Sequence, residues 1–263
     1  MAVVAVNDPD DPRIADYRHI SDAVLLKDRQ LFVAEGRHVV RRLLAGRRLV
    51  THSLLVTAPA LASLRGDLDP AALTTYLVPQ AVMNAVTGFN IHRGCLALGR
   101  SGAPLDWRVL ARGARRLVVL ERVGNADNVG AIFRNAAAFG ADAVLLGPDC
   151  ADPLYRKAIR TSMAAALAVP FAPAMPWPGA LHELRDSGMR VIGLSPDAGA
   201  PPIHDVAATL DRRVALVAGH EGDGLTRDAM DACDTLARIP MAGTVDSLNV
   251  ATAAGIALYE LWR

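Results

Sequence analysis

The sequence predicts an α/β fold in which a parallel sheet is covered by helices. Through the second half of the chain, short apolar runs alternate regularly with helical stretches. Each run is almost free of polar residues, which is typical of strands buried on both faces of a parallel sheet. The predicted strands are Leu117–Leu120, Ala143–Leu146, Arg190–Leu194, Val214–Ala218 and a short one at Leu236–Ile239. A last helix is predicted over Val250–Trp262, where apolar residues recur at helical spacing.

The first hundred residues predict a smaller α/β domain. Its strands are expected at residues 31–36, Ser53–Thr57, Thr75–Val78 and Gly94–Leu98, with helices through 39–44 and at Gln80–Val86. The stretch SGAPLDW that follows is typical of a connection, because it contains Gly102 and Pro104. We therefore expect one domain over residues 1–105, a linker over 106–112 and a second domain over 113–263. Four prolines between residues 170 and 179 predict a surface loop.

The composition indicates a globular protein with a local charge bias. The formal net charge is +1, which excludes the polybasic footprint of non-specific nucleic-acid binders. Residues 1–105 hold 12 Lys and Arg against 9 Asp and Glu, whereas residues 106–263 hold 16 against 18. The prevalence of Arg suits phosphate binding, and it equally suits a bias in genome base composition. No apolar run reaches the roughly 18 residues of a membrane span, so we expect a cytoplasmic protein.

Residues 117–147 form a predicted strand–turn–helix–strand unit. Ligands of open α/β sheets gather at the carboxyl ends of strands, so Asn125, Asn128 and Arg134 are expected near a site. Asn128 is a candidate helix cap, and Gly140 is a candidate helix end. In the alternative interpretation, neither residue has a function: Asn128 only caps the helix, and Arg134 is only a solvated helix residue. Apolar residues surround the helix in sequence, and they favour an anionic partner or a function for Arg134.

Residues 214–241 predict a buried strand that runs into a glycine-rich turn. Gly219, Gly222 and Gly224 permit close backbone approach, which suits a phosphate, but G-x-x-G-x-G is a poor dinucleotide motif. Glu221 would repel a pyrophosphate and is compatible with a cationic sulfonium cofactor. It could instead pair with Arg134 and hold the turn.

Residues 237–262 predict a loop followed by a slim last helix. Its alanines and Gly255 would let a neighbouring element, or the same helix of a second subunit, pack closely. Ser247 or Asp246 is expected to cap it, with Ser247 and Asn249 on its first turn and free for a ligand.

Four motifs together resemble the SpoU family, also called TrmH, of the SPOUT class of RNA methyltransferases. They are N-x-x-N-V-G-A-I-x-R-N-A at 125–136, G-x-E-G-x-G at 219–224, I-P-M at 239–241 and S-L-N-V at 247–250. The resemblance covers residues 113–263 and implies a parallel sheet with a C-terminal trefoil knot, an exception to unknotted folds. FVAEG at 32–36 is similar to the start of the family's small N-terminal α/β extension, which resembles a ribosomal protein and binds the RNA substrate.

The resemblance implies transfer of a methyl group from S-adenosylmethionine to a ribose 2′-hydroxyl of a structured RNA, with rRNA ahead of tRNA. It implies a homodimer and neither a metal nor a membrane. The implied active-site residues are Asn128, Arg134, Glu221, Ser247 and Asn249; the implied cofactor residues are Leu194, Ser195, Gly219, Ile239, Met241 and Leu248; candidate RNA contacts are Arg160 and Ser162. The chain departs from the family pattern at Glu121, where Asp is usual, at residues 126–127, where Pro is usual, and at residues 164–165, where Gly is usual.

Arg134 presents a chemical difficulty, because a guanidinium is essentially always protonated and is a poor base. We expect Arg134 to stabilise the developing alkoxide and to grip the adjacent phosphate, with Glu221 orienting it. The proton would pass to a phosphate oxygen or to water. The main alternative is a catalytically silent RNA-binding protein of the same fold; a nucleotide-dependent oxidoreductase is disfavoured by the glycine motif.

Overall fold

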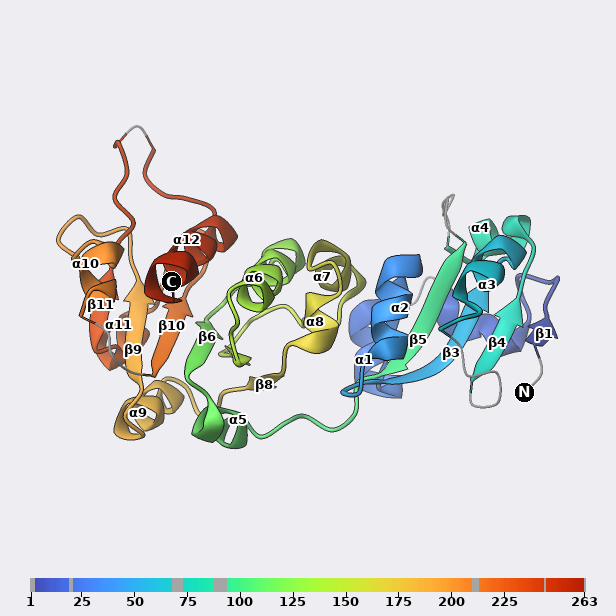
Figure 1. The fold of residues 1–263 in the computed structure, drawn as a ribbon, viewed down its shortest axis with the longest axis horizontal. Helices are drawn as coiled ribbons and strands as arrows, with labels where there is room; N and C mark the ends of the chain where they lie inside the picture. Colours follow the sequence, from blue (N-terminus) through green and yellow to red (C-terminus); the bar gives the residue numbers. More distant parts are fainter. Residues whose placement is uncertain are drawn as a thin grey trace. The chain divides into compact units, whose positions relative to one another are not determined.

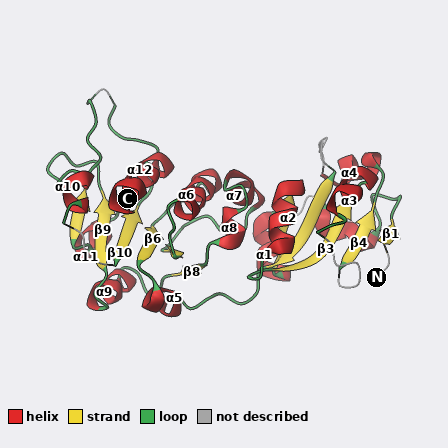
Figure 2. Ribbon diagram, viewed as in Figure 1, coloured by secondary structure: helices red, strands yellow, loops and turns green. Residues whose placement is uncertain are grey.

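The computed structural model describes residues 3–18, 21–67, 73–87, 94–209, 213–243 and 245–262. The chain forms two compact units, one of residues 1–103 with 154–168 and one of residues 104–153 with 169–263. Figure 1 shows the elements in chain order, and Figure 2 separates helices from strands. In the described part of the chain, no helix is both long and apolar enough to cross a membrane.

The first unit contains a mixed five-stranded sheet in the order β1-β4-β3-β5-β2. β1, β4 and β3 are parallel, and β5 is antiparallel to both β3 and β2. The strands are β1 Val3–Ala5, β2 Leu31–Glu35, β3 Val50–Val56, β4 Thr74–Leu77 and β5 Cys95–Arg100. The four strands predicted for this part of the chain are therefore confirmed, with ends shifted by up to three residues. The edge strand β1 was not predicted.

Helices of the first unit include the two that the sequence predicts, α2 Arg37–Ala45 and α4 Gln80–Thr87. The others are η1 Pro12–Tyr17, α1 Asp22–Arg29, α3 Ala58–Leu64, α7 Arg156–Thr161 and α8 Ala165–Ala168. Arg48 donates to the carbonyls of Ala166 (2.8 Å) and Leu167 (3.3 Å), so it holds the end of α8. Burial lowers the pKa of Arg48 to about 10.

The second unit contains a six-stranded sheet in the order β11-β9-β10-β6-β7-β8, and every pair is parallel. Its strands are β6 Arg116–Leu120, β7 Ala143–Leu146, β8 Phe171–Pro173, β9 Arg190–Leu194, β10 Val214–Ala218 and β11 Thr235–Ala237. The predicted parallel sheet is confirmed. β8 lies inside the stretch predicted as a loop; it is an edge strand, where proline is tolerated.

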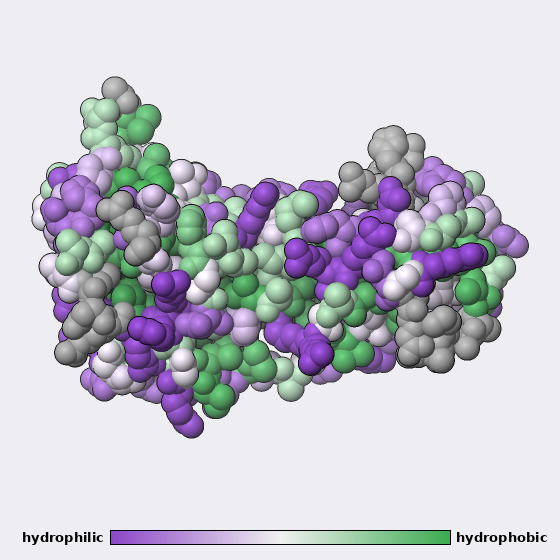
Figure 3. All heavy atoms as spheres, in the orientation of Figure 1, coloured by the Kyte–Doolittle hydropathy of each residue, from purple (hydrophilic) through white to green (hydrophobic). Residues whose placement is uncertain are grey.

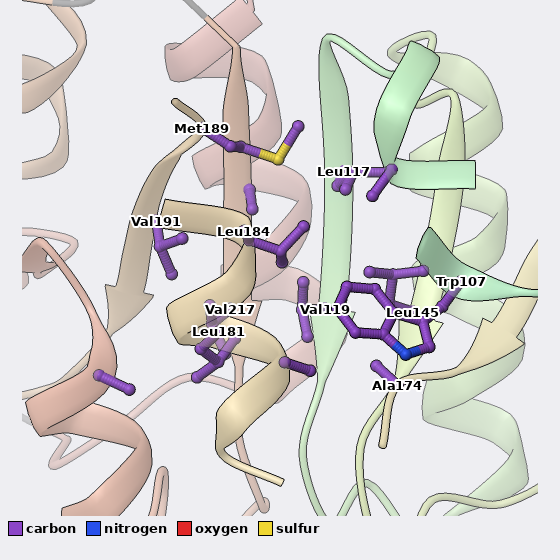
Figure 4. Packing of buried hydrophobic residues seen from close by; sticks show 14 of the residues in the cluster. Trp107, Leu117, Val119, Leu145, Ala174, Leu181, Leu184, Met189, Val191 and Val217 are labelled. Carbon is purple, nitrogen blue, oxygen red and sulfur yellow. The ribbon is translucent and has the colours of Figure 1, made fainter. Parts of the chain in front are cut away.

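Helices cover both faces of this sheet. They are α5 Trp107–Gly113, α6 Ala126–Ala138, α9 Gly179–Asp186, α10 Ile203–Ala207, α11 Arg227–Ala232 and α12 Val250–Trp262. On one face, Trp107 of α5 and Leu181 and Leu184 of α9 are buried against the strands (Figure 4), and α11 adds Ala229 and Ala232 to the same core. α6 and α12 pack against each other and against β7 and β10. The predicted linker at 106–112 is thus largely a helix, whose buried Trp107 belongs to the core.

Candidate functional site

A cavity of about 140 Å³ lies at the carboxyl ends of β9, β10 and β11. Its lining is mostly apolar and comes from residues 194–196 and 218–224 and from Ala237, Ile239, Met241, Ser247, Leu248, Val250 and Ala253. All six residues that the resemblance implies for the cofactor line it, namely Leu194, Ser195, Gly219, Ile239, Met241 and Leu248. Glu221 and Ser247 line it as well. Pro196, His220, Asp223 and Val250 also line the cavity and were not predicted to do so, although the last three stand within the motifs at 219–224 and 247–250.

The glycine-rich turn after β10 is closed by backbone contacts. His220 and Gly224 exchange two backbone hydrogen bonds, of 3.0 and 3.1 Å. A Cβ on Gly219 would lie 2.4 Å from the carbonyl carbon of Gly224, so only glycine fits there. Gly224 has a φ of +69°, which is the left-handed region that favours glycine. The turn is therefore rigidly shaped, and its shape forms one wall of the cavity.

Three predicted site residues form one directional chain of hydrogen bonds. Asn249 Oδ1 accepts from the amides of Ala251 (2.9 Å) and Thr252 (3.2 Å), so it caps α12. Its Nδ2 must then donate, and it donates to Asn128 Oδ1 at 2.9 Å. Asn128 in turn donates through Nδ2 to Glu221 Oε1. The first turn of α12 and the carboxylate at the cavity rim are therefore linked through α6.

These contacts correct two predicted caps. Asn125, not Asn128, caps α6, because its side chain accepts from the amide of Asp127 at 2.8 Å. Asn249, rather than Ser247 or Asp246, caps α12. Asn128 is thereby free to join the chain of hydrogen bonds, and exposed Ser247 keeps its hydroxyl beside the cavity.

Arg134 does not pair with Glu221. Its side chain lies on the exposed face of α6 with Ala137 and Ala138, and within the described ranges it has neither a hydrogen bond nor an ion pair. The expectation that Glu221 orients Arg134 is therefore wrong, and Arg134 itself is one of the few solvated residues of α6. The apolar residues that seemed to surround Arg134 in sequence are in part small alanines on an open face.

Glu121 connects β6 to the residue that follows the glycine-rich turn. It is fully buried at the end of β6 and accepts three hydrogen bonds. The donors are Trp177 Nε1 (2.7 Å), the Thr226 amide (2.8 Å) and the Thr226 hydroxyl (2.7 Å). Since Thr226 follows the glycine-rich turn and caps α11, this departure from the family's usual Asp ties β6 to the turn.

The two candidate RNA contacts differ in exposure. Arg160 is exposed on α7. Ser162 is only 1% exposed, and its hydroxyl donates to the carbonyl of Ile159 and accepts from the amide of Ala166. Ser162 is therefore a structural residue, contrary to the expectation of an RNA contact. Ala164, where the family commonly has glycine, has a φ of +70°.

α12 packs closely on α6, as its small residues predict. Asn135 of α6 donates to the carbonyl of Ala251 at 2.8 Å. A Cβ on Gly255 would lie 2.9 Å from Asn135 Nδ2, so glycine permits this approach. Among the residues that the structure describes, no group of three His, Cys, Asp or Glu side chains is placed to hold a metal ion.

Comparison with known proteins places this arrangement. Residues 115–259 match the SpoU rRNA methylase family. The chain belongs to that family. An uncharacterized tRNA/rRNA methyltransferase of Mycobacterium tuberculosis is 44% identical over 98% of this chain and 91% of its own length. The 23S rRNA (guanosine-2′-O-)-methyltransferase of Vibrio vulnificus is 34% identical over 65% of this chain and 70% of its own length.

Solved structures agree with the SpoU assignment. The AdoMet-bound rRNA methyltransferase from Sinorhizobium meliloti has a TM-score of 0.82 at 25% identity, covering 98% of this chain and 96% of that one. A TrmH-family RNA methyltransferase from Porphyromonas gingivalis has a TM-score of 0.81 at 26% identity, covering 96% and 97%. The likeness to the SpoU family inferred from the motifs is confirmed, as is the α/β fold with a parallel sheet.

Proposed function

We propose that this SpoU family member transfers a methyl group from S-adenosylmethionine to a ribose 2′-hydroxyl of a structured RNA, rRNA ahead of tRNA. The cavity that gathers all six expected cofactor residues carries the proposal. Its apolar walls suit an adenosyl group, and the carboxylate of Glu221 suits a positive charge nearby. The proposal includes the trefoil knot, which the segments around this cavity would form. S-adenosylmethionine would supply an electrophilic methyl group on a sulfonium sulfur.

Residues of the chain would align the hydroxyl and stabilise its charge. Arg134 is a fixed cation with five donors, so it can grip a phosphate and stabilise a developing alkoxide. It is free to do both because it has no partner in the described part of the chain. Asn128 and Asn249 hold Glu221 at the rim, and Ser247 would position the ribose or the cofactor. The proton would leave to a phosphate oxygen or to water.

The groove between α6 and α12 supports the proposed homodimer. Ala131, Asn135, Phe139, Asn249, Ala251, Thr252, Gly255, Ile256 and Tyr259 line it. Ile256 and Tyr259 are large hydrophobic side chains, yet they are 38% and 51% exposed. Because Asn249 also belongs to the hydrogen-bond chain, a second copy on this groove would lie beside the site. Tyr259→Glu should give a monomer in analytical ultracentrifugation; a dimer of unchanged affinity would refute this surface.

Residues 1–105 are proposed as the RNA-binding domain and residues 113–263 as the methyltransferase domain, to which α5, in place of the predicted linker at 106–112, also belongs. Residues 36–66 contain six arginines and no Asp or Glu. Arg37 and Arg42 are exposed on α2 without an ion pair to any described residue, whereas Arg41 pairs with Asp67. Figure 3 shows hydrophilic side chains gathered over this part of the first unit. Exposed arginines without an acidic partner suit the phosphates of RNA.

The test is methylation of total RNA with labelled S-adenosylmethionine, followed by mapping of 2′-O-methyl positions. The proposal predicts label at ribose and loss of turnover in Arg134→Ala. Arg134→Lys, which keeps the charge and loses the fork, should also turn over slowly. Calorimetry separates the alternative of a silent RNA-binding protein, because absence of S-adenosylmethionine binding by the wild-type chain would refute the methyltransferase proposal.

A further inference from the structure

The glycine-rich turn contains two amides that point at one atom. The backbone N–H groups of Gly222 and Asp223 donate to Nδ1 of His220, at 3.0 and 3.2 Å. Successive amides that converge in a turn form a concave site that binds anions in many proteins. Here the imidazole of the turn's own His220 occupies it. The turn therefore cannot bind a phosphate at these amides, although its three glycines are compatible with one.

The two hydrogen bonds also determine the tautomer of His220. A nitrogen that accepts N–H bonds carries no proton, so the proton of a neutral ring is on Nε2. The charged groups around the ring are Asp223, whose Oδ2 lies 3.9 Å from Nδ1, and the adjacent Glu221. Arg122 holds Asp223 from the other side, at 3.1 Å. Nδ1 of His220 therefore accepts the two hydrogen bonds that an anion would otherwise accept, and two carboxylates lie close to the ring.

We propose that His220 is a positioning residue for the cofactor site. By accepting from both amides, its side chain fixes residues 221–223 inside the turn that the backbone closes, and so sets the direction of Glu221. Glu221 then meets Asn128, and the turn keeps the shape that lines the cavity. The same contact excludes phosphate-bearing nucleotides from the turn and leaves the cavity to an adenosyl compound without phosphate. This inference rests on the proposed function.

The experiment compares two substitutions at one position. His220→Asn keeps an acceptor, because an Asn side chain readily accepts from the amide two residues later. His220→Leu keeps bulk and removes the acceptor. We expect S-adenosylmethionine to bind His220→Leu about tenfold more weakly in calorimetry, and His220→Asn within about threefold of wild type. His182→Leu, on the exposed face of α9, is the matched control and should bind as wild type.

Tryptophan fluorescence checks that His220→Leu is folded. If the folded variant binds S-adenosylmethionine as tightly as wild type, or if His220→Asn loses as much affinity as His220→Leu, the inference is overturned. A second readout does not depend on the cofactor. Nitrogen-15 NMR of labelled histidine should show His220 with an unprotonated, hydrogen-bonded Nδ1 and a protonated Nε2. A proton on Nδ1 overturns the inference by itself. Failure of the wild-type chain to bind S-adenosylmethionine would instead refute the proposed function, and the NMR result would still decide the role of His220 in the turn.

Discussion

The pairing of Glu221 with Asn128 rather than Arg134 predicts which residues are energetically coupled. A double-mutant cycle of Asn128→Ala and Glu221→Ala should show a coupling free energy of unfolding of about 1 kcal/mol. A hydrogen bond to a charged group is worth about 1.5–3 kcal/mol when buried, and exposure of Glu221 reduces that value. The parallel cycle of Arg134→Ala and Glu221→Ala should give a coupling within about 0.3 kcal/mol of zero.

Tryptophan fluorescence during urea unfolding suits this measurement. The three tryptophans of the chain, Trp107, Trp177 and Trp262, all belong to the second unit, so their signal follows that unit by itself. Asn249→Asp is a control that keeps the cap of α12, because a carboxylate still accepts from the first amides of that helix. It removes only the Nδ2 group that donates to Asn128. A coupling of Arg134 with Glu221 as large as that expected for Asn128, with none for Asn128, would refute the reasoning.

Three further predictions concern other parts of the chain. Glu121→Gln should lower the free energy of unfolding of the second unit by about 2 kcal/mol in urea, because an amide cannot accept all three buried hydrogen bonds; unchanged stability would contradict this. Arg37→Ala and Arg42→Ala should each weaken RNA binding and reduce its salt slope by about one in filter binding, whereas an unchanged slope places the RNA elsewhere. Burial, and to a smaller extent the charge of Arg100, lowers the pKa of His52. Below about pH 6.5 the unfolded state therefore binds more protons than the folded state. The first unit should therefore lose stability as the pH falls through that range, and His52→Gln should flatten the dependence in circular dichroism melts.

The sequence predicted the second sheet well because its signal is strong. β7, β9 and β10 begin and end at the predicted residues, because a continuous apolar run bounded by polar turns marks both ends of a strand. β8 was missed because its residues lie in a proline-rich stretch that predicts a loop, and β1 because an isolated run of three residues carries little pattern. α5 was missed because glycine and proline just before it suggested a linker, whereas Asp106 caps a helix there.

The site was predicted at the level of which segments meet, and less well at the level of contacts. The carboxyl ends of parallel strands share one edge of a sheet, so residues after β9, β10 and β11 had to converge. Which of several nearby polar side chains caps a helix depends on backbone angles that composition does not reveal. Asn125 and Asn249 are caps for that reason. Ser162 was expected to contact RNA because residues 160–167 resemble a family motif, and only packing shows that it is buried.

Arg134 shows what the single chain leaves incomplete under the proposed function. A guanidinium that must stabilise an alkoxide has to be oriented, yet no described residue of this chain orients it. Glu221, its expected partner, is already held by Asn128. Under the proposed function, a phosphate of the RNA would supply the anion that orients Arg134, because it has the required charge and bidentate geometry. On this reasoning, substrate binding itself assembles the catalytic arrangement, so Arg134→Ala should reduce turnover of RNA while leaving the calorimetric affinity for S-adenosylmethionine near that of wild type.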